Sequence, residues 1–188
     1  DLPNGALIGT ASIRRQAQLL SMRPDLKFGI LRGNVQTRLG KLKDGVCDAT
    51  FLALAGLKRL GMADVASDII APDILLPACG QGAVGITCRD DDAVTLTRLA
   101  AINDAPTWAA VTCERAMLAV LDGSCRTPIG GLAEIEAGTM RLRGLVARAD
   151  GTEIFRTERQ GSAADAERIG KDAGFDLRGQ APANLFGA

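Results

Sequence analysis

The chain has 188 residues, of which 47% are hydrophobic and 23% charged, and its 22 basic and 22 acidic residues give a net charge of zero. This balance argues against a whole-surface attraction to nucleic acid or to a membrane, so an anion site must be local. The sequence contains no apolar run long enough to span a bilayer and no secretory signal pattern, which favours a soluble, cytoplasmic protein. Five cysteines without CxxC spacing, together with the absence of histidine, argue against a structural metal site and a disulfide framework.

The first sixty residues alternate between short apolar runs and helical patterns. The predicted order is strand, helix, strand, helix, strand, helix, over residues 5–9, 13–23, 26–31, 35–43, 49–54 and 55–60. Such alternation predicts an α/β fold, a doubly wound lobe with a mixed or parallel sheet like that of periplasmic binding proteins. Ligands bind such sheets beyond the carboxyl ends of the strands. We therefore expect residues 9–12 and 32–34 to share a ligand-binding edge.

The second half of the sequence has a different pattern. The predicted elements are a strand, two helices, three strands and a helix, over residues 83–88, 91–102, 104–122, 132–135, 141–147, 154–158 and 162–171. With turns at 137–138 and 150–151, this predicts a small α+β domain with a three-stranded antiparallel sheet. We expect a loosely ordered tail from Gly174 onwards. The predicted parts are a central α/β domain, a crossing segment and a C-terminal α+β domain, over residues 1–76, 77–103 and 104–188.

A lone thiol, Cys125, lies in a segment where core packing does not require it. Gly123 ends an apolar helical run and Pro128 prevents another helix, so the residues between them should form an exposed loop. Cys113, in contrast, lies on the apolar stripe of a helix and is expected in the core. Cys125 is therefore either a reactive group or an incidental surface thiol.

Arginines gather where two predicted helices begin. If Ser12 caps its helix, Arg14 and Arg15 lie in the first turn, where a cation opposes the helix dipole at a cost of about 0.3–1 kcal/mol. Arg32 precedes the next helix and Arg38 lies one turn inside it. Together with free helix N–H groups, these guanidinium groups predict a polyanion site. The alternative is four solvated arginines paired with acids elsewhere.

Six motifs in sequence order carry a resemblance to a known family. They are TASIRRQ, LRGNVQTRL, AGLKRL, GQGAVGI, ERA and GSCRTP, at residues 10–16, 31–39, 55–60, 80–86, 114–116 and 123–128. This set resembles the ordered motifs of the porphobilinogen deaminase family, also called hydroxymethylbilane synthases, from Ala6 to about Gly170. The resemblance implies a transferase of tetrapyrrole (haem) biosynthesis. Such an enzyme condenses four porphobilinogen molecules into hydroxymethylbilane and releases ammonia at each addition.

The resemblance also implies a cofactor and a set of ligand-binding residues. In the family the oligopyrrole product grows on a dipyrromethane primer, which would be held here by a thioether to Cys125. The residues matching cofactor-binding positions are Cys125, Thr10, Ser12, Arg14, Arg15, Arg32, Arg38, Gln81 and Gly82. Those matching substrate-binding positions are Arg32, Arg38 and Arg59. A dipyrromethane carries four carboxylates, which four arginines would neutralise.

The sequence departs from the family in one respect. The family has an N-terminal domain with an aspartate that handles protons, and no part of this sequence matches it. Asp48, Asp104 and Glu114 do not match that aspartate, so no general acid or base is assigned. We expect a fragment, inactive alone, whose exposed apolar surface leads to self-association or to binding of an N-terminal piece.

Two other functions remain open. A non-catalytic module that binds carboxylates or other anions on the same kind of α/β lobe would leave Cys125 unmodified. Nucleic-acid binding through the arginines would show a steep salt dependence. The zero net charge and the 3% content of aromatic residues weigh against the second of these.

Overall fold

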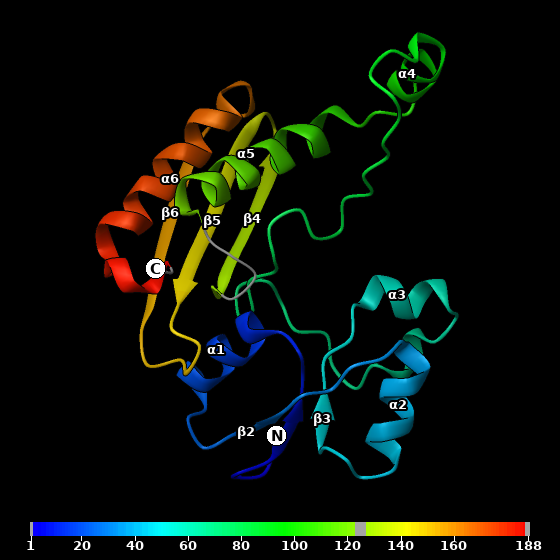
Figure 1. Cartoon of the computed structure of the whole chain (residues 1–188), viewed down its shortest axis with the longest axis vertical. Coiled ribbons are helices and arrows are strands. Elements are labelled where there is room, and N and C mark those ends of the chain that lie inside the picture. The colour runs from blue at the N-terminus through cyan, green and yellow to red at the C-terminus, as the bar shows by residue number, and fades with distance from the viewer. Residues whose placement is uncertain (1, 123–126, 187–188) are drawn as a thin grey trace.

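The computed structural model describes residues 2–122 and 127–186, and its strands form two separate three-stranded sheets. The N-terminal sheet is parallel, with the strand order β2-β1-β3. Its strands and helices are β1 (Leu7–Gly9), α1 (Ile13–Met22), β2 (Lys27–Gly29), α2 (Val35–Lys43), β3 (Ala49–Thr50) and α3 (Leu54–Arg59). The two crossovers run in opposite directions across the central β1, so right-handed connections place α1 and α2 on opposite sides of the sheet. Figure 1 shows this arrangement, and the predicted α/β lobe is confirmed.

The C-terminal sheet is an antiparallel meander in the order β4-β5-β6, as predicted. Its elements are α5 (Ala105–Leu121), β4 (Ile129–Glu136), β5 (Thr139–Ala147), β6 (Ile154–Ser162), η2 (Ala163–Asp165), α6 (Ala166–Gln180) and η3 (Ala183–Leu185). The predicted turn between β4 and β5 is formed by Ala137 and Gly138, both with positive φ, at 47° and 80°. Such a turn matches the right-handed twist of a hairpin.

Helices α5 and α6 cover one face of this sheet and enclose the main core (Figure 1). Alternate residues of β5, including Met140 and Leu142, point into this core because successive side chains of a strand face opposite sides. Met117 of α5 lies so close to the sheet that a Cβ added to Gly131 would meet its Cε at 2.7 Å. Cys113 is fully buried in the same core, as predicted.

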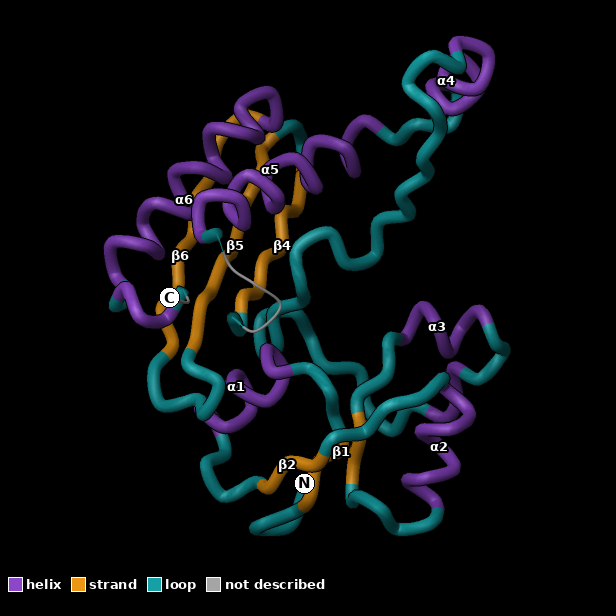
Figure 2. The backbone as a smooth tube through the Cα atoms, in the orientation of Figure 1, coloured by secondary structure: helices purple, strands orange, loops and turns teal. Residues whose placement is uncertain are grey.

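The expected strand over residues 83–88 is wrong, because residues 83–89 have no regular structure. A strand needs a neighbour for its backbone groups, and within the described ranges no other segment pairs with this one. Val84 is 80% exposed. The segment leads to α4 (Ala93–Ala100), which lies away from both sheets (Figure 2).

The expectation of a loose tail is also wrong. Helix α6 continues through Gly174 to Gln180, and both Leu177 and Phe186 are buried in the main core. Glycine usually weakens a helix, but here Gly170 and Gly174 lie where α5 and α6 come closest. A Cβ on Gly174 would lie 2.6 Å from Cβ of Val120, so these glycines permit the contact.

A smaller correction concerns α2. The stripe of Val35, Leu39 and Leu42 was expected to be buried, but these side chains are only half-buried. The short η1 (Ala63–Val65) follows α3. No helix of the described ranges is both long enough and apolar enough to cross a lipid bilayer.

Candidate anion-binding site

The carboxyl ends of the parallel strands carry the start of α1. The N–H of Thr10 donates to the carbonyl of Gly29 at 2.9 Å, which extends the pairing of β1 and β2 by one residue. The hydroxyl of Thr10 accepts from the N–H of Ser12 at 3.1 Å, and the Ser12 hydroxyl accepts from the N–H of Arg15 at 3.4 Å. Ser12 is therefore the N-cap of α1, as predicted.

Arg14 is buried, with an exposed fraction of 9%. Its guanidinium donates to the carbonyl of Leu76 and, at 3.4 Å, to Oε1 of Gln81. Burial lowers the pKa of Arg14 to about 10, and the positive charge of Arg15 adds to the effect. Among the described residues no carboxylate forms an ion pair with it.

Arg15 points across the same edge of the sheet. Its guanidinium donates to the carbonyl of Phe51, just beyond β3, at 3.2 Å and lies 5.8 Å from the centre of the Phe51 ring. Burial lowers the pKa of Arg15, and the charge of Arg38 on α2 lowers it further. The structure thus brings Arg14, Arg15 and Arg38 to one edge of the lobe.

Arg38 is held by the loop before α2. Its Nε donates to the carbonyl of Gly33 at 2.8 Å, and Asn34 caps the helix by accepting from the N–H of Thr37 at 2.8 Å. Arg32 lies in the same loop with an exposed side chain, and its carbonyl accepts from Lys41 at 3.2 Å. The start of α2 therefore offers cations and a helix N-terminus together.

Arg59 lies apart from this group, at the C-terminal end of α3. Its side chain is exposed and forms no ion pair with the described residues. The structure therefore does not join Arg59 to the other arginines by a contact.

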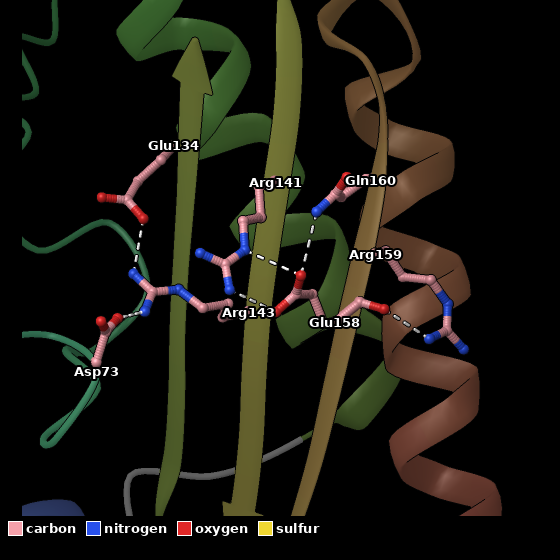
Figure 3. Close-up of polar contacts among 7 residues, drawn as sticks. All are labelled: Asp73, Glu134, Arg141, Arg143, Glu158, Arg159 and Gln160. Carbon is pink, nitrogen blue, oxygen red and sulfur yellow. Dashed lines mark hydrogen bonds and ion pairs between the residues drawn. The ribbon is translucent and has the colours of Figure 1, made fainter.

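The arginines of the C-terminal sheet behave differently. Arg141 binds Glu158 at 2.8 Å, while Arg143 binds both Glu134, at 2.6 Å, and Asp73 (Figure 3). Over residues 2–122 and 127–186, the five predicted ligand-binding arginines of the N-terminal lobe have no such partner. Acids of the described chain therefore do not neutralise them, which favours an anion site over the alternative of paired surface arginines.

Gln81 and Gly82 lie in the loop that connects the lobe to the C-terminal domain. Gln81 touches the site through Arg14, and its Oε1 also accepts from the N–H of Ala78 at 3.3 Å. Gly82 has a φ of 99°, a conformation that favours glycine. Gln81 thus joins the site, while no described contact links Gly82 to the arginines.

Two residues hold this loop in ways that the sequence did not predict, Gln18 and Glu114. Gln18 is 1% exposed and pairs with both backbone groups of Leu76, accepting from its N–H at 2.8 Å and donating to its carbonyl at 3.1 Å. Glu114 accepts from the N–H of Gly80 and the N–H of Ala133. The sequence signal that could have indicated their burial is their position: Gln18 directly follows Ala17, and Glu114 directly follows Cys113, on the apolar stripes of the two helices.

Cys125 lies outside the described residues, so its predicted role stays a prediction. The segments that flank it are described. Helix α5 ends at Leu121, before Cys125 in the sequence, and β4 begins at Ile129 after it. On β4, the N–H of Gly131 donates to the carbonyl of Pro77 at 2.9 Å. Pro77 follows Leu76, which accepts from Arg14. β4 and the buried Arg14 are therefore bound to two adjacent residues, Pro77 and Leu76.

This fold and this set of cations are suited to a class of protein in which an α/β lobe, joined to an α+β domain, binds an anionic ligand at the carboxyl edge of its sheet. Two family models match the chain. One, described as porphobilinogen deaminase, dipyromethane cofactor binding domain, matches residues 1–97, and the other, porphobilinogen deaminase, C-terminal domain, matches residues 108–179. The chain belongs to the porphobilinogen deaminase family, and the resemblance drawn from its motifs is confirmed.

Named relatives agree with this assignment. Porphobilinogen deaminases of Paracoccus denitrificans, Nitrobacter winogradskyi and Nitrobacter hamburgensis are 55%, 52% and 50% identical to the chain over 186 residues. The alignments cover 99% of this chain and 59% of each relative. The chain therefore spans about three fifths of the length of these relatives.

The described residues fit the family's cofactor. A dipyrromethane presents several carboxylates, and the lobe presents Arg14, Arg15 and Arg38 without bound acids, with burial lowering the pKa values of the first two. An anion brought to this edge would relieve their mutual repulsion. The donor set is thus of the right sign and kind for a polycarboxylate.

Proposed function

We propose that this chain is the cofactor-holding part of an enzyme that assembles hydroxymethylbilane from four porphobilinogen molecules in cytoplasmic tetrapyrrole biosynthesis. The single observation that carries the proposal is the cluster of arginines at the carboxyl edge of the parallel sheet, for which the described part of the chain provides no acid partner. When bound through Cys125, the dipyrromethane supplies the free pyrrole end from which the product grows. The residues of this chain bind and orient its acid side chains.

The arginines divide between the two ligands. The buried Arg14 and the half-buried Arg15 bind the carboxylates of the cofactor, and the exposed Arg59 meets those of incoming porphobilinogen. Arg32 and Arg38, at the start of α2, serve both ligands. A charge-assisted hydrogen bond contributes about 1.5–3 kcal/mol. Free association costs an estimated 4–15 kcal/mol, and a covalent tether to Cys125 removes most of that cost. Tether and cations together hold the ligand firmly.

Three acids that were considered from the sequence, Asp48, Asp104 and Glu114, hold the fold together instead of serving as proton donors or acceptors. Asp48 accepts from the N–H of Leu7 at 2.7 Å, and Asp104 caps α5 by accepting from the N–H of Thr107 at 2.8 Å. Glu114 is occupied by two backbone N–H groups. These three carboxylates are engaged in holding the fold, so we propose that turnover needs an acid outside this chain and that this chain binds without turning over.

The test is the intact mass of the purified chain combined with a chromogenic reaction for pyrroles. The expected result is a dipyrrole adduct that is absent in Cys125→Ser. Arg14→Ala should retain less pigment, whereas Arg98→Ala, which changes an arginine of α4 away from the site, should retain as much as the parent chain. An unmodified Cys125 with reversible carboxylate binding would instead support the non-catalytic anion-binding module.

We further propose that the segment between α3 and α5 binds the part of the enzyme that this chain does not span. Large apolar side chains are exposed along and beside it, at Ile69, Ile74, Val84, Ile86, Ile102 and Trp108. Exposed apolar surface of this extent favours association. Light scattering should show concentration-dependent self-association, and the double change Val84→Asp with Ile86→Asp should reduce it. A monomer at all concentrations would contradict this proposal.

A further inference from the structure

Glu114 is a buried carboxylate with two backbone partners and no cation. It lies on α5 with an exposed fraction of 5%. Its Oε2 accepts from the N–H of Gly80 at 2.5 Å and its Oε1 from the N–H of Ala133 at 2.8 Å. No ion pair to Glu114 exists within the described part of the chain. A buried unpaired charge is costly, so packing alone does not explain why an acid lies there.

The two partners belong to segments that matter for the site. Gly80 precedes Gln81, whose Oε1 accepts from Arg14 at 3.4 Å. Ala133 lies on β4, the strand that follows Cys125 in the sequence. The carboxylate of Glu114 therefore connects Gly80, the residue before Gln81, to Ala133 on β4.

Burial of Glu114 raises its own pKa, and burial together with the charge of Glu114 raises the pKa values of two neighbouring thiols. Burial raises the pKa of Glu114, although the two N–H donors oppose the rise. Burial and the neighbouring carboxylate raise the pKa of Cys79 to about 12, and the same two causes raise that of Cys113 to about 12. Both thiols thus remain neutral, and the two N–H groups are the polar partners of the carboxylate.

We propose that Glu114 is a positioning residue, whose carboxylate fixes the turn at Gly80 and, through Gln81, the guanidinium of Arg14 relative to the strand that follows Cys125. The inference rests on the proposed function only for the identity of the ligand. The coupling from Glu114 to Arg14 is a property of the ligand-free chain and can be measured there.

The first experiment uses nuclear magnetic resonance of the full ligand-free chain. Glu114→Gln replaces one acceptor with a donor that faces a backbone N–H, so the exchange of the Gly80 or Ala133 amide should accelerate about tenfold or more. The signals of the Gln81 side-chain amide and of Arg14 Nε–H should shift. The matched control is Glu134→Gln, which changes an exposed acid on the opposite face of the sheet and should leave these signals unchanged. Unshifted Arg14 and Gln81 signals in Glu114→Gln overturn the inference.

If Glu114→Gln does not fold, Glu114→Asp takes its place. It keeps the charge but withdraws the carboxylate by one methylene. The same signals should then shift in the same direction, and their constancy would again overturn the inference.

The second experiment uses calorimetry in a double-mutant cycle to measure the binding of citrate, a soluble polycarboxylate that stands in for the acid side chains of the cofactor. Glu114→Gln and Arg14→Ala should each raise the Kd about tenfold, and the double variant should lose little more than either, because Glu114 acts through Arg14. Strictly additive effects would indicate a general structural role and overturn the inference. A parent chain that binds no citrate, but whose Arg14 signal still depends on Glu114, would refute the proposed carboxylate site and leave the positioning role standing.

Discussion

Arg15 lies on α1 and Arg38 on α2, yet the positive charge of Arg38 helps to lower the pKa of Arg15. The two side chains meet because both helices start at the same edge of the parallel sheet, one after β1 and the other after β2. With no acid partner among the described residues, their repulsion is uncompensated until an anion arrives. If this edge is the proposed anion site, the ligand-free lobe should be less stable than a variant that lacks one of these charges.

The substitution Arg38→Gln should stabilise the ligand-free chain. Removing one of two like charges relieves about 0.5 kcal/mol after allowing for solvent screening, which corresponds to a rise in Tm of about 1–2 °C. The same variant should gain less from added citrate, a soluble polycarboxylate, than the parent chain gains. Thermal unfolding with and without citrate checks both effects, with Arg98→Gln as the control. A lower Tm for Arg38→Gln without citrate would contradict this account.

Gly170 and Gly179 on α6 should respond to alanine in opposite ways. A Cβ at Gly170 would lie 2.8 Å from Cβ of Ala116 and would collide with the carbonyl of Cys113, whereas a Cβ at Gly179 meets nothing within 4 Å. Gly170→Ala should therefore lower the free energy of unfolding by about 1–3 kcal/mol or more. Gly179→Ala should raise it by up to about 0.5–1 kcal/mol through helix propensity. Urea unfolding measures both, and equal effects would show that α5 and α6 are not in close contact at Gly170.

Asp104 should make the stability of the chain depend on pH below the neutral range. Its carboxylate accepts from the hydroxyl and the N–H of Thr107, and these bonds lower its pKa. A lowered folded-state pKa means that the stabilisation is present above the unfolded value of about 3.9 and is lost as pH falls through the folded value. Asp104→Ala should thus lower the urea midpoint at about pH 6 and have a shrinking effect below about pH 4. Asp104→Asn keeps the cap and should show no such pH dependence.

Gln18 should be more important to stability than its polar type suggests. Gln18→Met keeps the volume but leaves the N–H of Leu76 without its buried partner. Such a loss costs about 1–3 kcal/mol. Gln16→Met, two residues earlier on the same helix, removes only a 3.4 Å bond to the carbonyl of Ala149 and should change the urea midpoint little. A similar midpoint for both variants would contradict the role of Gln18.

The sequence predicted a feature correctly where the local pattern and the tertiary packing favour the same structure. Ser12 before a helical stripe predicted the cap of α1, and the Ala137–Gly138 pair predicted the turn between β4 and β5. The convergence of Arg14, Arg15 and Arg38 also followed from the sequence, because parallel strands place their carboxyl ends at one edge. These features depend on neighbours in the chain and on a general rule of sheet geometry.

The sequence failed where a residue's role depends on a distant partner. The apolar residues 83–88 look like a strand, but the described chain offers them no strand to pair with. Gly170 and Gly174 look like helix breakers until α5 is placed against them. Gln18 and Glu114 were overlooked because their partners, Leu76 and Gly80, lie 58 and 34 residues away.

Two backbone donors on the outer edge of β4 are occupied, one by the segment that connects the two sheets and one by α5. The N–H groups of Gly131 and Ala133 are taken by Pro77 and Glu114, so that edge offers these donors to no foreign strand. An open edge is the usual template for fibrillar stacking. At the opposite edge of the sheet, Arg156 and Glu158 of β6 add charges that oppose flat stacking. Pro77, which follows Leu76, and Glu114, which binds Gly80 beside Gln81, therefore also shield part of this sheet edge from pairing with strands of other molecules.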